Sequence, residues 1–149
     1  MMIFFYLYLC RKGCVMRDND ISEIRRQHIA NAFFEEMKSL RKYSLTQDDI
    51  IRSVMTKGAP RFYVSYENAR RYVSKIDRGK PLGLKNKNTI LMYEELYRRY
   101  KEYKEKTGFV GYQILAKILQ EKAPSYYIDL KTFREIIYGY YRLRKKCRS

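Results

Sequence analysis

Residues 57–76 read KGAPRFYVSYENARRYVSKI, and residues 121–140 read EKAPSYYIDLKTFREIIYGY. When Ala59 is aligned with Ala123, apolar residues fall on apolar residues throughout both stretches, without a slip in register. Both stretches contain the pattern A-P-x-[FY]-Y-[VI], followed by a run with helical spacing of apolar residues. A recurrence of this kind indicates that the chain uses one structural unit twice.

The residues on either side of this block predict the same order of elements in both copies. Ahead of it, Thr46 and Asp49 form a capping-box pattern that opens a helix, and Pro60 prevents that helix from continuing. Behind it, Ser65 is placed to cap the next helix, whose Val73 faces the core. The long helices are expected over residues 21–42, 89–106 and 130–143. We therefore predict a mainly α fold of two tandem helix, helix, short extended segment, helix repeats that share one core.

Composition sets the expected boundaries of these repeats. Residues 77–88, DRGKPLGLKNKN, contain two glycines and a proline and are the only stretch with linker composition. We assign residues 16–80 to the first repeat, residues 81–88 to the linker and residues 89–149 to the second repeat with its basic C-terminal tail.

The first ten residues, MMIFFYLYLC, are apolar but too few to span a bilayer as a helix. No basic residue precedes them, as a signal peptide would require. Met16 opens a more ordinary protein start, so we predict that residues 1–15 are an upstream extension with no structural role.

Charge is the property of this chain that lies farthest from average. Lys and Arg total 32 against 16 Asp and Glu, which gives a net charge of +16, and the excess is spread along the sequence. A field of this sign attracts polyanions, nucleic acid first and anionic membrane second. The alternative is a basic protein whose charges serve only solubility. Because the expected helices have ordinary polar faces, we predict no membrane association.

We predict that the chain binds nucleic acid, with DNA favoured, mainly through phosphate contacts. A helix-turn-helix is disfavoured because the connection over residues 58–65 is longer than the usual three or four residues. The candidate phosphate-binding residues are basic and lie either around the first A-P block and linker or in the tail: Arg61, Arg70, Arg71, Lys75, Arg78, Lys80, Lys85, Lys87, Arg142, Arg144, Lys145, Lys146 and Arg148.

The competing hypothesis is a protein that binds another protein, such as a phage assembly component or a small regulator. The chain has 16 Tyr, and Tyr-rich helical surfaces suit protein interfaces as well as cores. The distribution of charge separates the two hypotheses. One continuous basic face favours nucleic acid, whereas scattered charges around an exposed Tyr patch favour a protein partner. The oligomeric state does not follow from the sequence.

No catalytic or cofactor-binding pattern is present. The sequence has no G-x-x-x-x-G-K phosphate loop, and its three Cys and one His do not have metal-ligand spacing. Asp48 and Asp49 are explained by the helix N-terminus that they occupy. We therefore predict no enzymatic activity, no metal site and no cofactor. The odd cysteine count without a secretory signal indicates a reducing, cytoplasmic setting.

The A-P-R-F-Y-V block with a capped helix behind it resembles one found in small uncharacterised helical proteins of Bacteroides-type bacteria, their phages and mobile elements. The resemblance covers residues 58–76 and, more weakly, residues 123–140. It implies a bacterial host or a phage-infected cell as the setting, and it carries no catalytic residues with it.

Overall fold

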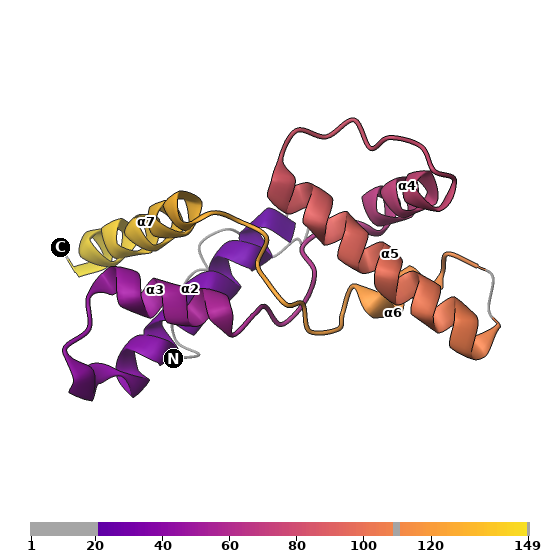
Figure 1. Cartoon of the computed structure of the whole chain (residues 1–149). Helices are drawn as coiled ribbons and strands as arrows, with labels where there is room; N and C mark the ends of the chain where they lie inside the picture. The colour runs from indigo at the N-terminus through magenta and orange to yellow at the C-terminus, as the bar shows by residue number, and fades with distance from the viewer. Residues whose placement is uncertain (1–20, 109–110, 149) are drawn as a thin grey trace. The chain divides into compact units, whose positions relative to one another are not determined.

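A computed structural model describes residues 21–108 and 111–148 of the chain (Figure 1). Within this part the chain is helical, with loops and one isolated β-bridge between the helices, which confirms the mainly α prediction. The elements follow in this order along the chain: α2 (Ile21–Ser39), the 3₁₀ turn η2 (Arg41–Tyr43), α3 (Gln47–Thr56), α4 (Tyr66–Asp77), α5 (Lys87–Thr107), α6 (Ile114–Ile118) and α7 (Leu130–Arg148).

The chain divides into two compact units whose limits differ from those of the expected repeats. The first unit combines the chain up to Thr56 with the segment from Leu130 onward, and the second is Lys57–Asp129. The first unit therefore contains α2, α3 and α7, and the second contains α4, α5 and α6. The linker-like residues 77–88 lie inside the second unit.

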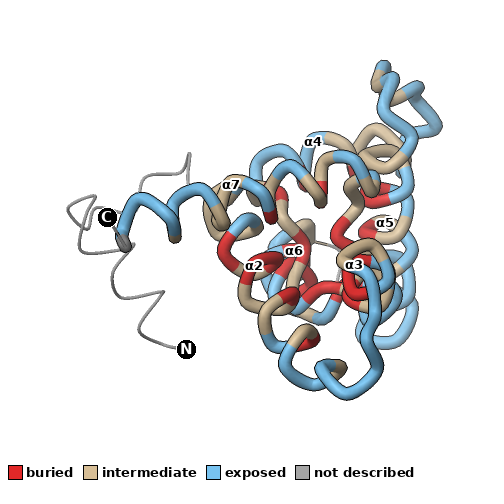
Figure 2. The backbone as a smooth tube through the Cα atoms, turned by 90° about the vertical axis from the view of Figure 1, so that its left-hand side faces the viewer, coloured by how far each residue is buried: buried red, intermediate tan, exposed pale blue. Residues whose placement is uncertain are grey.

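In the first unit, α2 packs against α3 and α7, and α3 packs against α7. The side chains that meet there are fully or almost fully buried and come from all three helices: Ile29, Phe33, Ile51, Val54, Phe133 and Ile137. One buried polar residue, Glu36, accepts a hydrogen bond at 2.8 Å from the Ser53 hydroxyl of α3. Figure 2 shows that the buried positions alternate with exposed ones along each helix, as amphipathic helices require.

In the second unit, α4, α5 and α6 likewise pack against one another in all three pairs. Its core consists of apolar side chains from these helices and the loops beside them: Phe62, Ala69, Val73, Leu96, Tyr100, Leu115 and Ile118. The helix ends follow ordinary capping rules. Ser65 accepts a hydrogen bond from the Asn68 N–H, Asn86 caps α5, and Gly108 ends α5 in the left-handed conformation.

The two A-P blocks meet in the second unit. The Ala59 N–H donates to the Ala123 carbonyl, and the Ala123 N–H donates to the Ala59 carbonyl, both at 2.9 Å. Next to this bridge, Phe62 stacks on Tyr127 and Tyr63 stacks on Tyr126, with ring centroids 6.2 and 6.0 Å apart. The backbone bridge and the ring pairs fix the two segments against each other.

Most expected helix starts are observed, but several ends are not. Thr46 and Asp49 form the predicted capping box, and neither Pro60 nor Pro124 lies in a helix. The first long helix stops at Ser39, short of the expected residue 42, because the chain tightens into η2. The second extended segment is interrupted at Tyr127, whose φ of 55° lies in the left-handed region.

The last helix does not end at the expected residue 143, because α7 continues through Arg148 and includes the basic tail. Its last turns are mostly exposed, as Figure 2 shows. Leu, Arg and Lys dominate this stretch and all favour helix, so local propensity extends α7 beyond its packed part. The predicted extension, residues 1–15, lies outside the described residues.

Gly58 provides a test of the bridge between the A-P blocks. Its φ is +79°, and a Cβ placed there would lie 2.6 Å from the Ala123 carbonyl oxygen. We expect Gly58→Ala to lower the free energy of unfolding by about 1 kcal/mol for the left-handed backbone and by about 1–3 kcal/mol more for the displaced segment. Urea denaturation measures the loss.

Gly79→Ala is the matched control for this prediction. Gly79 has a similar φ of +68°, but a Cβ there meets nothing within 4 Å. Gly79→Ala should therefore lose only the part of the free energy of unfolding that comes from placing alanine in the left-handed conformation. Equal losses in the two variants would contradict the role assigned to the close approach at Ala123.

An ion pair joins α3 to α7 within the first unit. Arg134 Nε donates to Asp48 Oδ1 at 2.8 Å, and its Nη2 donates to Oδ2, so the contact is bidentate. The Arg134 hydrogen bonds hold the pKa of Asp48 below its ordinary value of 3.8. A carboxyl with a lowered folded-state pKa stabilises the fold above its unfolded pKa, and this contribution is lost as the pH falls through the lowered value.

Arg134→Gln should therefore destabilise the chain in a pH-dependent way. The difference in urea midpoint between wild type and variant should be largest near about pH 6 and should close toward about pH 2. Arg70→Gln is the control, because its partner Glu67 is 74% exposed and such pairs contribute little. If the difference in urea midpoint between wild type and Arg134→Gln does not change with pH, the stabilising role of the Asp48–Arg134 ion pair is contradicted.

Candidate nucleic-acid interface

The exposed face of α4 and the end of this helix carry four of the predicted phosphate-binding residues. Ala69 and Val73 point into the core of the second unit, so the opposite face of α4 is left for solvent. Helical periodicity places Arg70, Arg71 and Lys75 on that outer face, and Arg78 follows at the helix end. The four cations thus share one side of one helix.

These cations line a shallow hollow of about 350 Å³. Asn68, Ser74, Glu67 and Tyr112 complete its lining, so one carboxylate faces four basic side chains. Hydroxyl and amide groups among cations are the donors that proteins use against phosphate oxygens. The hollow is therefore suited to an anionic group with several acceptor oxygens.

Two contacts hold the side chains of this hollow in place. Arg78 donates from Nη2 to the Ser74 hydroxyl at 2.8 Å and from Nε to the Ser74 carbonyl at 3.3 Å. Arg70 pairs with Glu67 at 3.1 Å, and both side chains are mostly exposed. An exposed pair of this kind is weak, so a phosphate can replace the carboxylate at little cost.

The ring of Tyr72 contacts the other two cations of the hollow, Arg71 and Lys75. The Arg71 guanidinium lies 5.0 Å from the centre of the Tyr72 ring, and the Lys75 ammonium lies 5.2 Å from it. The same ring packs against Tyr93 of α5, with centroids 4.4 Å apart. Burial raises the pKa of Tyr93 to about 12, so its hydroxyl stays neutral beneath the cations. Cation–π contact keeps Arg71 and Lys75 extended over an apolar base without neutralising their charge.

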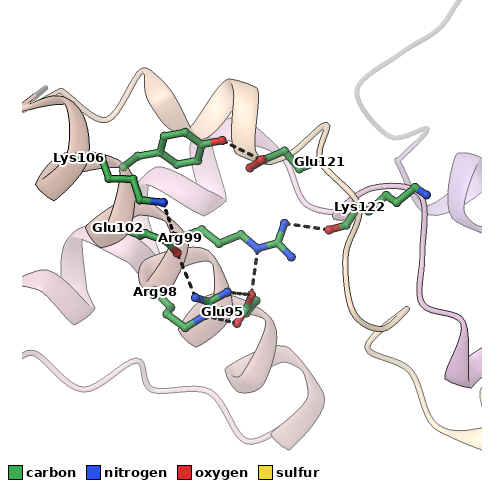
Figure 3. Close-up of polar contacts among 8 residues, drawn as sticks. Glu95, Arg98, Arg99, Glu102, Lys106, Glu121 and Lys122 are labelled. Atoms are coloured by element: carbon green, nitrogen blue, oxygen red, sulfur yellow. Dashed lines mark hydrogen bonds and ion pairs between the residues drawn. The ribbon is translucent and has the colours of Figure 1, made fainter.

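Helix α5 also carries basic residues, but acidic residues pair with Arg98, Arg99 and Lys106 on one of its faces (Figure 3). Arg98 lies between Glu95 and Glu102, at 2.7 and 3.2 Å. Glu95 also pairs with Arg99, and Glu102 pairs with Lys106. The hydrogen bond from Arg98 lowers the pKa of Glu95, so the carboxylate stays charged and offsets part of the positive charge of this face.

Arg99 on this face is held further, because its Nη1 donates to the Lys122 carbonyl at 2.8 Å. Its guanidinium also lies 4.9 Å from the centre of the buried Phe62 ring. The first contact ties α5 to the residue before the second A-P block, and the second ties it to the first A-P block. In contrast, Arg71, Lys75 and Arg78 have no carboxylate within ion-pair distance among the described residues.

The remaining predicted residues lie outside the hollow. Arg61 donates to the Phe62 carbonyl and lies over the Tyr63 ring. Three further lysines of the second unit are exposed in the loop after α4 or at the start of α5: Lys80, Lys85 and Lys87.

The C-terminal candidates lie on α7, in the other compact unit. Arg142, Lys145 and Lys146 are exposed there, whereas Arg144 lies 5.5 Å from the centre of the Phe34 ring. Arg148 is the last residue of α7, and its side chain is outside the described part of the chain.

Sequence reasoning missed the polar partners of the cations. Ser74 lies one helical turn from both Arg70 and Arg78, so the spacing on α4 could have indicated it. Tyr112 could not be found in this way, because it reaches the hollow only through the packing of a segment far along the chain. Its hydroxyl donates to Asp77 at 3.4 Å.

Within the described residues, no helix is long and apolar enough to cross a membrane. The same residues contain no group of three or more His, Cys, Asp or Glu side chains placed to hold a metal ion. No protein-family model, curated protein or solved structure matches the chain. The functional argument therefore depends on the geometry and charge of the chain itself.

Proposed function

We propose that this chain binds nucleic acid, chiefly through contacts between the basic hollow of α4 and phosphate groups. The observation that carries the proposal is the gathering of Arg70, Arg71, Lys75 and Arg78 around one hollow that contains a single carboxylate. The net charge of +16 adds a long-range attraction for any polyanion. The contrast with α5, where the charges are paired internally, makes α4 the face available to a ligand.

Duplex DNA is the favoured partner. α4 is a 12-residue helix whose outer side is exposed, and the major groove of B-DNA admits one α-helix. Cations along the outer side of such a helix reach the phosphates that border the groove. The exposed Lys80, Lys85 and Lys87 extend the positive charge along the chain that follows α4. The proposed setting is the cytoplasm of a bacterial or phage-infected cell.

We further propose that the fold consists of two tandem repeats that exchange their last helices. The order α2, α3, α4 in the first copy corresponds to α5, α6, α7 in the second. Each packed helix pair in the first unit then has a counterpart in the second unit. The α2–α3 pair corresponds to α5–α6, the α2–α7 pair to α5–α4, and the α3–α7 pair to α6–α4.

Burial and pairing support the same correspondence. Ile51, Val54 and Val73 are buried, and so are their counterparts Leu115, Ile118 and Ile137. Ala59 pairs with its own counterpart Ala123, and the stacked rings cross over, Phe62 with Tyr127 and Tyr63 with Tyr126. Self-pairing of equivalent residues is expected where the matching segments of two copies meet.

The basic face belongs to only one of the two copies. The counterparts of Arg71 and Lys75 on α7 are Glu135 and Gly139. The counterpart of Arg70 is Arg134, which forms an ion pair with Asp48 of α3. Therefore one copy supplies the proposed phosphate-binding face, and the matching positions of the other copy lack a comparable group of cations.

Replacing Arg70, Arg71 and Lys75 together with Ala tests the proposed function. Each neutralised phosphate contributes about 0.9 to the slope of log affinity against log salt concentration, so the triple variant should lose up to about three units of slope. Fluorescence anisotropy with a short labelled duplex, a single strand and an RNA hairpin at several salt concentrations measures this change.

A second triple variant controls for the loss of charge itself. Lys38, Arg52 and Lys131 are exposed basic residues on α2, α3 and α7, in the other compact unit. Replacing them with Ala removes the same charge but should leave most of the slope intact. If both variants bind alike, or if the wild-type chain binds none of the three probes at about 50 mM salt, the proposal is wrong.

A further inference from the structure

An open apolar groove lies in the first compact unit, outside the basic face. Its volume is about 570 Å³, within the range of sites that bind ligands or peptide side chains. The groove is lined from α2, η2, the start of α3 and α7. Most of the lining is apolar or aromatic: Phe33, Met37, Leu40, Leu45, Ile50, Tyr138 and Tyr141.

The rim of this groove exposes large apolar side chains. Tyr138 is 48% exposed and Leu45 is 42% exposed, although both line the groove. Tyr43 of η2, in the turn that leads to Leu45, is 66% exposed. Exposed apolar groups gathered around one hollow are typical of a protein interaction site. Among the described residues of the second unit, the large exposed apolar side chain is Leu91 of α5.

The second unit indicates what such a groove accepts, an argument that rests on the repeat proposed above. Met37 and Tyr141 line the open groove, and their counterparts are Tyr100 and Asp77. There, the ring of Tyr112 stacks on Tyr100 at 5.2 Å, and its hydroxyl donates to Asp77. An aromatic side chain of the second unit therefore packs at this place. In the first unit the Tyr141 hydroxyl donates to the Met37 sulfur at 3.7 Å, and the groove lies beside this contact, where Leu45 and Tyr138 line it.

The charge of the groove lining indicates which kind of partner can bind there. Arg41 and Lys145 line the groove, and no carboxylate is among its lining residues. A second copy of this chain would bring another +16 to a basic rim, so self-association is disfavoured. The apolar residues 1–10 carry no acidic group and so do not complement the rim either.

We infer that this groove docks a partner protein through an acidic amphipathic segment with an aromatic anchor. The aromatic ring packs against the exposed Leu45 and Tyr138, which line the groove. Acidic residues beside the anchor face Arg41 and Lys145. The chain thus has two separate surfaces, one for phosphates and one for a peptide, in different compact units.

The test uses a fluorescent peptide of about 16 residues with a central Tyr, Leu at helical spacing and Glu on the opposite face. A peptide of the same composition in scrambled order measures attraction by charge alone. The full-length chain should bind the amphipathic peptide at least about tenfold more tightly than the scrambled one, by fluorescence anisotropy.

Neutral substitutions separate the groove from the charge of the chain. Leu45→Asn and Tyr138→Asn should each weaken peptide binding about tenfold, because each removes an exposed apolar contact at the rim. Leu91→Asn is the matched control, since Leu91 is 53% exposed but lies on α5, and it should bind the peptide as wild type does. Circular dichroism melting curves establish that all three variants are folded.

The triple variant of Arg70, Arg71 and Lys75 distinguishes this inference from the proposed function. It should bind the peptide normally while it loses affinity for duplex DNA. The inference is overturned if the two peptides bind equally, or if Leu91→Asn weakens peptide binding as much as the groove variants do. It is also overturned if the peptide binds only to a chain that lacks residues 1–15. A dimer in light scattering that Leu45→Asn dissociates would overturn it as well. The last two outcomes would assign the groove to the N-terminal segment or to a second copy.

Discussion

The backbone bridge between Ala59 and Ala123 is the constraint on which the second unit depends. It brings two segments that are far apart in the sequence within hydrogen-bonding distance, and it requires glycine at position 58, because a side chain there would meet the Ala123 carbonyl. The stacked aromatic pairs then cover the bridge. Since α4 begins directly after the first segment, this pairing also fixes where the basic face starts.

The proposed repeat combines two similar cores with two unequal surfaces. Both copies keep the apolar residues that the core requires, because loss of any one would leave a cavity. Their outer residues are free to differ. One copy has Arg71 and Lys75 on a cation–π base, while the equivalent places in the other hold Glu135 and Gly139. In this proposal, the repeat supports one phosphate-binding face and leaves another surface, the groove of the first unit, for a separate partner.

The sequence predicts the local structure well because capping and periodicity are local effects. Thr46, Ser65 and Pro60 mark their helix boundaries correctly, and Val73 is buried as its register requires. The grouping of helices into compact units could not be predicted, because it depends on which apolar faces pack together and not on chain order. For the same reason, the basic residues of α4 could be named, but Tyr112 beside them could not.

A nuclear magnetic resonance titration with a short DNA duplex tests the central claim most directly, because it locates the contact residue by residue. The account predicts that amide signals of α4 from Asn68 to Arg78 shift first, and that those of the paired face of α5, from Glu95 to Lys106, shift little. Shifts spread evenly over both helices, or centred on α5, would contradict it.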